Sequence, residues 1–280
     1  MKVIIGIDEN GDYESSVKLL SWLELDSPEV ALVHVDDSNI LSGKRDFSYV
    51  SEFELAQLDF EEALLEKAEH FCKKWGFSTS KSILHGSPAK LLVEQARKDK
   101  ADIVCVGAKR RSKFNSSLFG SVGRALAISS NRSVLIAKST LSPDGPFTVV
   151  VTTDHSEYSD KALKLLLKLK PKGIQRLILL TAYTPNPRGH ADGTNEATRK
   201  SIEEKSKSTV NKLFRKGIPA EYRVIEGDLG EVVEAQMDAV KGDLLIMGAQ
   251  GEGHIGMMSI GSSALKQVVS SKHSILLLRP

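Results

Sequence analysis

Residues 242–263 read GDLLIMGAQGEGHIGMMSIGSS, an apolar run that leads into a loop with five glycines between residues 248 and 263. A short apolar run of this kind is typical of a strand in a parallel sheet that is covered on both faces. The segment SSALKQVVSSKH (262–273) then has the pattern of a helix. The stretch therefore predicts a strand, a glycine-rich loop and a helix, which is the repeating unit of a doubly wound α/β sheet.

The same unit occurs earlier in the chain. ADIVCVGAK (101–109) matches GDLLIMGAQ (242–250), and the first strands KVIIGID and FTVVVTTD match with Asp8 aligned to Asp154. Three pairs of glycines are separated by one and the same offset: Gly86 and Gly227, Gly107 and Gly248, and Gly120 and Gly261. The offset between the first strands is only slightly larger. A nearly constant offset over half of the chain indicates that one domain is duplicated.

Each half alternates strands and helices in the same order, with five apolar strand segments in each. We therefore expect two tandem, doubly wound, Rossmann-like α/β domains, near residues 1–140 and 147–280, each a five-stranded parallel sheet with helices on both faces. The last segments of the two halves, VLIAK (134–138) and ILLLR (275–279), are apolar and would leave sheet edges that invite association. We expect the two domains to pair through these segments. The sequence leaves open whether two such chains also form a homodimer.

The composition excludes several classes of protein. The 280 residues carry a net charge of +2, which gives no electrostatic footprint for nucleic acid. Cys72 and Cys105 lie in apolar patterns and are expected to be core residues rather than metal ligands or a disulfide. The start of the chain predicts a strand rather than a signal peptide, and no apolar run reaches the roughly 20 residues needed to cross a membrane. We expect a soluble cytoplasmic protein.

The glycine loop of the second half has a physical use. In an open parallel sheet, ligands bind beyond the carboxyl ends of the strands, where a helix N-terminus offers free N–H groups to an anion. Glycines let the backbone approach phosphate oxygens and would permit a positive φ at Gly261, while Ser262 and Ser263 add hydroxyl donors. The segment 251–256 also fits G-x-G-x-x-G, but no acidic residue follows Glu252 to hold a ribose, and no Walker A loop occurs. The alternative is a flexible loop in which Ser262 is a simple N-cap.

With two α/β copies, an aspartate closing the first strand and the pattern G-x2-G-x9-G-S at residues 248–262, the chain resembles the universal stress protein family over nearly its whole length. The resemblance implies that the second domain binds ATP. No acidic pair in the sequence suggests a dedicated metal site, although a bound triphosphate usually brings its own Mg²⁺. The implied contacts to adenine, ribose and phosphates are Thr153, Asp154, Ala182, Met247, Gly248, Gly251, Gly261, Ser262 and Ser263. For Asp154, a role as N-cap of the following helix is the alternative.

The first half departs from this pattern. Five of its residues match the nucleotide-binding pattern, and they are Asp8, Val35, Gly107, Gly120 and Ser121. Arg110 occupies the second glycine position, in a basic loop at residues 109–113. An arginine there either fills the phosphate path or pairs with a phosphate. We expect a degenerate first site.

The sequence shows no nucleophile and base that would form a catalytic set. His155 and His254 lie near the second site, where they are expected to be exposed loop residues. We therefore expect a nucleotide-binding stress-response protein that acts as a sensor or as an adaptor for a protein partner, and at most a weak ATPase. A slow ATP hydrolase and an interaction scaffold without nucleotide are the alternatives.

Overall fold

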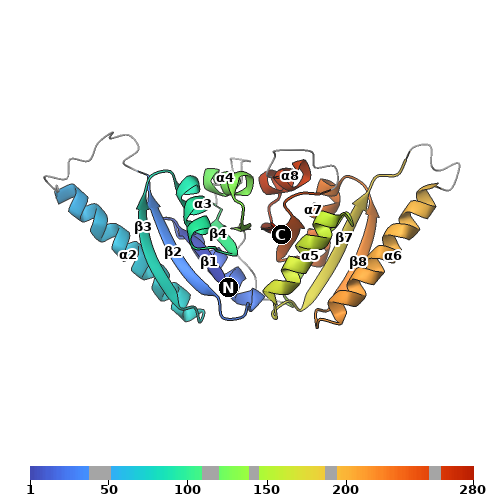
Figure 1. The fold of residues 1–280 in the computed structure, drawn as a ribbon, viewed down its shortest axis with the longest axis horizontal. Coiled ribbons are helices and arrows are strands. Elements are labelled where there is room, and N and C mark those ends of the chain that lie inside the picture. The colour runs from blue at the N-terminus through green and yellow to red at the C-terminus, as the bar shows by residue number, and fades with distance from the viewer. Residues whose placement is uncertain (38–51, 109–119, 139–144, 187–193, 252–259) are drawn as a thin grey trace.

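The computed structural model describes residues 1–37, 52–108, 120–138, 145–186, 194–251 and 260–280 (Figure 1). The first half contains β1 (Lys2–Ile7), α1 (Tyr13–Leu23), β2 (Glu29–Asp36), α2 (Glu52–Lys74), β3 (Thr79–His85), α3 (Pro88–Lys98), β4 (Ile103–Gly107), α4 (Ser121–Ser129) and β5 (Ser133–Ala137). The second half contains β6 (Thr148–Thr152), α5 (Glu157–Leu169), β7 (Arg176–Tyr183), α6 (Thr194–Phe214), β8 (Ala220–Glu226), α7 (Leu229–Val240), β9 (Leu244–Gly248), α8 (Ser262–Ser270) and β10 (Ser274–Leu278).

The described strands form one continuous 10-stranded sheet in the order β3-β2-β1-β4-β5-β10-β9-β6-β7-β8. All pairs within each half are parallel, and only β5 and β10 pair antiparallel. Figure 1 shows β3 and β8 toward the two outer sides, with α4 and α8 at the centre. The predicted fold class, two tandem doubly wound α/β domains with five parallel strands each, is confirmed. The domain limits at residues 140 and 147 stay a prediction, because residues 139–144 lie outside the described part.

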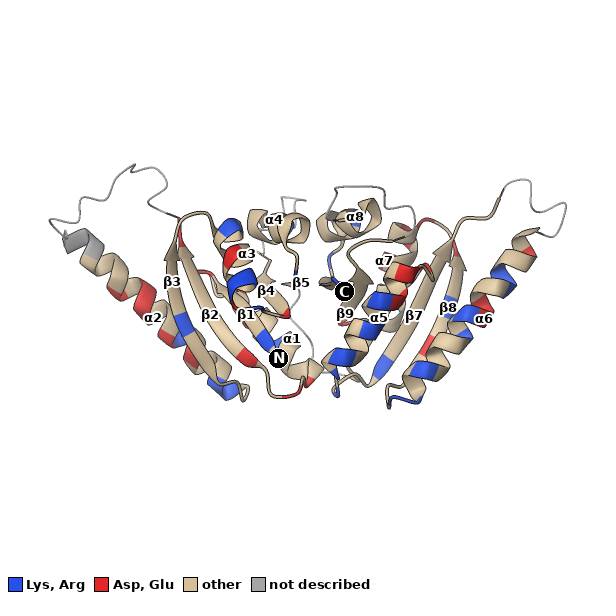
Figure 2. Ribbon diagram, viewed as in Figure 1, with Lys and Arg blue, Asp and Glu red and all other residues tan. Residues whose placement is uncertain are grey.

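The core lies in two layers, one on each face of the sheet. Along β10, Leu276 and Leu278 belong to one apolar cluster, whereas Ile275 and Leu277 belong to the other. This alternation is the period of two that a strand imposes, and both faces are buried because helices cover both. Cys105 and Cys72 are buried, unpaired members of the first layer, which confirms that they are core residues. Charged residues of both signs occur along α2, α5 and α6 (Figure 2).

The two halves join through β5 and β10, as the sequence predicts. Leu135 pairs with Leu276, its own counterpart in the second half, and the flanking pairs Val134 with Leu277 and Ile136 with Ile275 exchange in the same way. An antiparallel pairing centred on a residue and its own counterpart, with the neighbours exchanged around it, indicates a pseudo-twofold axis between the halves.

Side chains that follow these two strands cross the same axis. Lys138 Nζ donates to the carbonyl oxygens of Val268 (3.0 Å) and Ser271 (2.6 Å) at the end of α8. Its counterpart, Arg279, donates from Nη2 to the carbonyl oxygen of Ala127 in α4. The two halves are therefore one packed body rather than two beads on a linker.

Candidate nucleotide site

The turn after β6 contains the first two predicted site residues, Thr153 and Asp154, of which one is buried and the other exposed. Thr153 is buried, and its hydroxyl oxygen lies 3.1 Å from Ser159 Oγ and accepts a hydrogen bond from His155 N at 3.0 Å. Because its hydroxyl group is used within the turn, Thr153 shapes the turn rather than presenting a side chain to a ligand. Asp154, the next residue, is exposed at the carboxyl end of the sheet. The carboxylate of Asp154 is therefore the accessible acceptor of this turn.

Asp154 does not cap α5. Its Oδ1 accepts from Ser156 N at 3.0 Å, and Ser156 is the N-cap whose hydroxyl accepts from Ser159 N at 3.2 Å. The N-cap alternative for Asp154 is thus wrong, because the helix begins two residues later than that role requires. The other oxygen, Oδ2, faces Gly251, where an added Cβ would lie only 2.7 Å from it. Only glycine at residue 251 leaves this carboxylate in place.

The glycine loop returns to the same point at the start of α8. Gly261 N donates to the carbonyl oxygen of Ala249 at 2.7 Å, which closes the loop beside the end of β9. Gly261 is the N-cap of α8, and as a glycine it has no side chain that could cap the helix. The alternative that Ser262 is the N-cap is therefore wrong. Ser262 and Ser263 are exposed in the first turn, where backbone N–H groups have no partner within the helix. Residues 252–259, including His254, lie outside the described residues.

The backbone of this protein does not explain the glycine at residue 261. Its φ is −72°, which any residue can adopt, and among the described residues the atoms nearest to an added Cβ would be Ala249 O and Gln250 Cα at 3.6 Å, an ordinary contact. The counterpart Gly120 also has a negative φ, with no atom within 4 Å of an added Cβ among the described residues. A side chain at these positions would enter the space in front of a helix N-terminus, which none of the described residues fills. That space is the place where an anion would lie.

Ala182 and Met247 lie on either side of this turn because β6 runs between β7 and β9. Met247 is buried in a core layer, so only its backbone could line a ligand, while Ala182 is partly buried at the end of β7. Gly248 packs tightly, since an added Cβ would lie 3.2 Å from the ring of Tyr158. The structure thus brings all nine predicted residues to one edge of the sheet, and it places Asp154 and Gly251 in direct contact.

His155 is not the exposed loop residue that the sequence predicts. It has a φ of 57°, and its Nε2 lies 3.0 Å from Ser206 Oγ and 3.3 Å from Thr181 Oγ1. Burial, followed by the positive charge of Lys205, lowers its pKa. The ring therefore fastens the turn to α6 and β7, and it points away from the glycine loop. No spacing in the sequence reveals this contact, because Ser206 lies far along the chain from His155.

The first half carries a similar but narrower arrangement. Asp8 Oδ1 accepts from Tyr13 N at 3.2 Å, Val35 is the next-to-last residue of β2, and Ser121 begins α4. At Gly107, however, an added Cβ would lie 2.3 Å from the backbone of Asp12, so the turn before α1 closes directly on the end of β4. At Gly248, the counterpart of Gly107, the atom nearest to an added Cβ would be farther away, at 3.0 Å. Arg110 lies outside the described residues.

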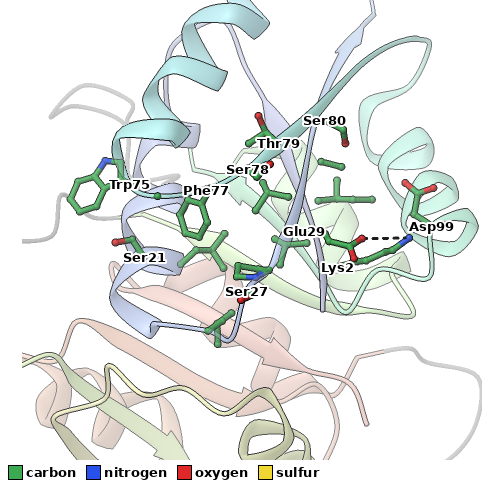
Figure 3. Close-up of a pocket in the computed structure, with 18 of the residues that line it drawn as sticks. Lys2, Ser21, Ser27, Glu29, Trp75, Phe77, Ser78, Thr79, Ser80 and Asp99 are labelled. Atoms are coloured by element: carbon green, nitrogen blue, oxygen red, sulfur yellow. Dashed lines mark ion pairs between the residues drawn. The ribbon is translucent and has the colours of Figure 1, made fainter.

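A pocket of about 930 Å³ lies elsewhere, beside Trp75, Phe77 and Glu29 (Figure 3). It opens at the amino ends of β1, β2 and β3, where Lys2 Nζ and Glu29 Oε2 form an ion pair at 3.9 Å. The predicted site residues all lie at the carboxyl ends of the strands, at the opposite edge of the sheet from this pocket. This pocket is therefore not part of the candidate site.

Two doubly wound α/β domains in tandem, with glycines at the carboxyl ends of their strands, define the class of fold. The universal stress protein family matches residues 1–138 and again residues 147–279, and the chain belongs to this family.

Three relatives show the same correspondence. A universal stress protein of Methanocaldococcus jannaschii is 30% identical over 115 residues, which cover 41% of this chain and 67% of that protein. One of Thermus aquaticus is 25% identical over 134 residues, or 47% of this chain and 98% of that protein. The crystal structure of a universal stress protein from Archaeoglobus fulgidus superposes with a TM-score of 0.67 at 17% identity, covering 100% of this chain and 98% of that one. This last likeness shows that the whole tandem fold is shared. Within the described residues, no helix combines the length and apolarity of a membrane span.

Proposed function

We propose that the second domain binds ATP in the crevice between the turn after β6 and the start of α8. The observation that carries the proposal is that Asp154 Oδ2, Gly251 and the start of α8, whose N-cap is a glycine, lie close together. An acceptor carboxylate suits the exocyclic amine of adenine. Free N–H groups at a helix start, with two exposed serines, suit the phosphates.

The residues divide the nucleotide between them. Asp154 accepts from the base, and the backbone of Ala182 and Met247 borders it. Gly248 and Gly251 leave room for the ribose, and Gly261, Ser262 and Ser263 hold the phosphates. The triphosphate carries Mg²⁺ with it, and the magnesium needs no dedicated protein ligands in this role.

We assign the protein the role of a cytoplasmic stress-response sensor or adaptor whose partner choice depends on the bound nucleotide. Efficient catalysis needs a base beside the phosphates. His155, which follows Asp154 in the same turn, is instead held by Ser206 and Thr181. A binding role therefore fits this crevice better than rapid hydrolysis.

Mass spectrometry of the small molecules released from freshly purified protein tests the proposal, together with calorimetric titration of ATP. We expect one ATP per chain, lost in Gly251→Arg because a side chain there displaces the Asp154 carboxylate. Ser270→Arg, at the exposed far end of α8, adds the same charge away from the crevice and should bind ATP normally.

Other outcomes identify the alternatives. ATP turnover that survives purification and is lost in Gly251→Arg would make the protein a slow hydrolase. A chain that releases no nucleotide and binds none would be an interaction scaffold. Two equal sites per chain would contradict the degenerate first site.

A further inference from the structure

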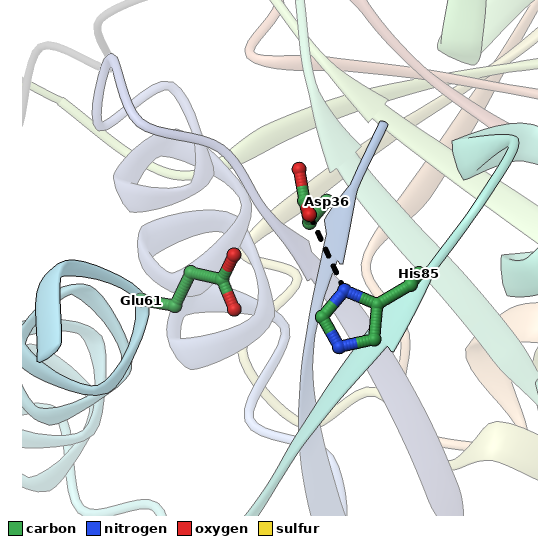
Figure 4. Close-up of side chains that lie close together, drawn as sticks. All are labelled: Asp36, Glu61 and His85. Atoms are coloured by element: carbon green, nitrogen blue, oxygen red, sulfur yellow. Dashed lines mark hydrogen bonds and ion pairs between the residues drawn. The ribbon is translucent and has the colours of Figure 1, made fainter. Parts of the chain in front are cut away.

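Three metal-ligating side chains meet in the first half, at a place that the nucleotide proposal does not use. Asp36 ends β2, His85 ends β3, and Glu61 lies on α2, which covers the same two strands (Figure 4). One ligand atom from each lies within 4.8 Å of the others. Since β2 and β3 are parallel neighbours and Asp36 pairs with His85 in register, the fold itself brings these residues together.

Glu61 supplies an independent sign that something is bound there. Its side chain is only 2% exposed, and its Oε2 has no hydrogen-bond partner among the described residues. Its other oxygen, Oε1, accepts from Gln57 Nε2 at 3.2 Å, which holds the carboxylate in one orientation. Figure 4 shows this carboxylate directed toward Asp36 and His85. A buried carboxylate oxygen without a partner costs free energy unless a cation or donor satisfies it.

The charges point to a cation rather than to a neutral donor. Asp36 is 7% exposed and Glu61 is 2% exposed, so two carboxylates share a buried site. Like charges in such a place repel each other, and a cation between them removes both the repulsion and the cost of burial. His85 lies at the rim with its side chain 35% exposed, which gives an ion a way in from the solvent.

We propose that Asp36, Glu61 and His85 form a divalent transition-metal site, for which Zn²⁺ is the matching ion. The Nδ1 of His85 lies 3.3 Å from Oδ2 of Asp36. Two ligands of one tetrahedral zinc, at bond lengths of about 2.0–2.2 Å, lie roughly 3.3–3.6 Å apart. This pair already has that spacing, and a shift of roughly 1 Å by the Glu61 side chain would complete three ligands.

The ligand set distinguishes Zn²⁺ from the hard cations. Imidazole nitrogen suits zinc and its transition-metal neighbours, whereas Mg²⁺ and Ca²⁺ prefer oxygen ligands alone. Gln57 would act as a positioning residue, because it holds the Glu61 carboxylate without contacting the ion.

The second half provides a natural control. Its strands β7 and β8 end in Tyr183 and Glu226, which pair in the same register as Asp36 and His85. The offset that relates the glycines after α2 and α6, Gly76 and Gly217, places Ile202 where Glu61 stands. This combination cannot hold zinc, so one ion per chain is expected rather than two.

Calorimetric titration of the full chain with Zn²⁺ alone, after treatment with a chelator, tests the proposal. The wild-type chain should bind one Zn²⁺, and Glu61→Gln, which keeps the shape of the side chain, should weaken binding at least about 100-fold, since losing even a residue behind a ligand costs 10–100-fold. Glu226→Gln, at the counterpart of His85, should leave the affinity unchanged. Mg²⁺ at the same concentration should give no signal that depends on Glu61.

The unfolding temperature gives a second readout. Zn²⁺ should raise the unfolding temperature of the wild-type chain and of Glu226→Gln, but not that of Glu61→Gln or His85→Gln. Because the His85 side chain is 35% exposed, His85→Gln should fold normally. Equal Zn²⁺ affinity in the wild-type chain and both of these variants would overturn the proposal. So would a wild-type chain that binds no Zn²⁺ and whose unfolding temperature zinc does not change. Neither result would bear on ATP binding by the second domain.

Discussion

At Gly261, the effect of a substitution on folding can be measured separately from its effect on ligand binding. Its φ of −72° suits any residue, and an added Cβ would make only an ordinary contact at 3.6 Å. We therefore expect Gly261→Val to fold, with a loss of about 1 kcal/mol of stability from a poorer N-cap. A valine side chain would stand in the phosphate path, and charge-assisted hydrogen bonds are each worth about 1.5–3 kcal/mol. Calorimetry should show ATP affinity reduced at least about 100-fold.

Two further variants, Ser262→Ala and Gly120→Val, serve as comparisons for this prediction. Ser262→Ala should cost less than Gly261→Val, because the backbone donors remain. Gly120→Val, the same change in the first half, should leave ATP binding by the second half intact. If Ser262→Ala is the more harmful change, the hydroxyl rather than the backbone is the main phosphate contact.

His155 makes stability depend on pH. Because burial lowers its pKa in the folded chain, the unfolded chain binds more protons once the pH falls below about 6.5. The contribution of His155 to the free energy of unfolding is therefore fully present above that pH and is lost as the pH falls below it. Urea unfolding at pH 7.5 and pH 5 should show a smaller loss for His155→Gln than for the wild-type chain. His273, whose pKa burial also lowers, should keep part of the dependence in that variant. Identical pH dependence in both chains would show that the His155 contact is not maintained in solution.

At the scale of single elements, the strands were predictable and the turns were not. Strands such as β5 (SVLIA) and β10 (SILLL) are buried on both faces, and this burial leaves a continuous apolar run in the sequence. The caps depend on local competition between neighbouring polar residues. Ser156 rather than Asp154 caps α5, and Gly261 rather than Ser262 caps α8.

The side-chain cluster on α2, β2 and β3 could not be predicted from the sequence. Asp36, Glu61 and His85 have no characteristic spacing, since each stands on a different element and far from the others along the chain. Only the pairing of β2 with β3 and the docking of α2 place them together. The candidate nucleotide site was easier to find because a repeated glycine pattern marks it twice.

The end of α8 depends on a lysine from the other half. Burial lowers the pKa of Lys138 to about 7, although the charge of Glu234 opposes the shift. Between pH 7 and the unfolded value near 10.4, the unfolded chain binds the extra proton, so stability rises with pH. Burial raises the pKa of Cys72 to about 12, and that acts in the opposite direction above about pH 8.5.

The test of Lys138 therefore belongs between pH 7 and pH 8.5. The free energy of unfolding should rise in this window for the wild-type chain, by an amount on the order of 1–2 kcal/mol. Lys138→Met should lose the rise. A variant that keeps the same slope would show that Lys138 remains charged against the two carbonyl oxygens.

At the scale of the whole molecule, the halves are interchangeable at their junction. Leu135 pairs with its own counterpart Leu276, and Val134 and Ile136 meet Leu277 and Ile275 in reversed order. A second copy of β10 could therefore take the place of β5 with Leu276 opposite Leu276. An isolated fragment of residues 147–280 would otherwise leave β10 as an open apolar edge, which favours association.

We therefore expect the fragment 147–280 to form a dimer through β10, whereas the full chain has this edge covered. Analytical ultracentrifugation at about 50 μM should show twice the fragment mass, since strand pairing and two buried apolar faces drive the association. Leu276→Asp should return the fragment to a monomer, because it would put two carboxylates opposite each other at the axis. Lys272→Asp, on the exposed surface beside β10, is the matched control and should leave the dimer intact. A folded fragment that stays monomeric would mean that β5 contributes contacts that β10 cannot supply, and that the match of the two halves is one of backbone register alone.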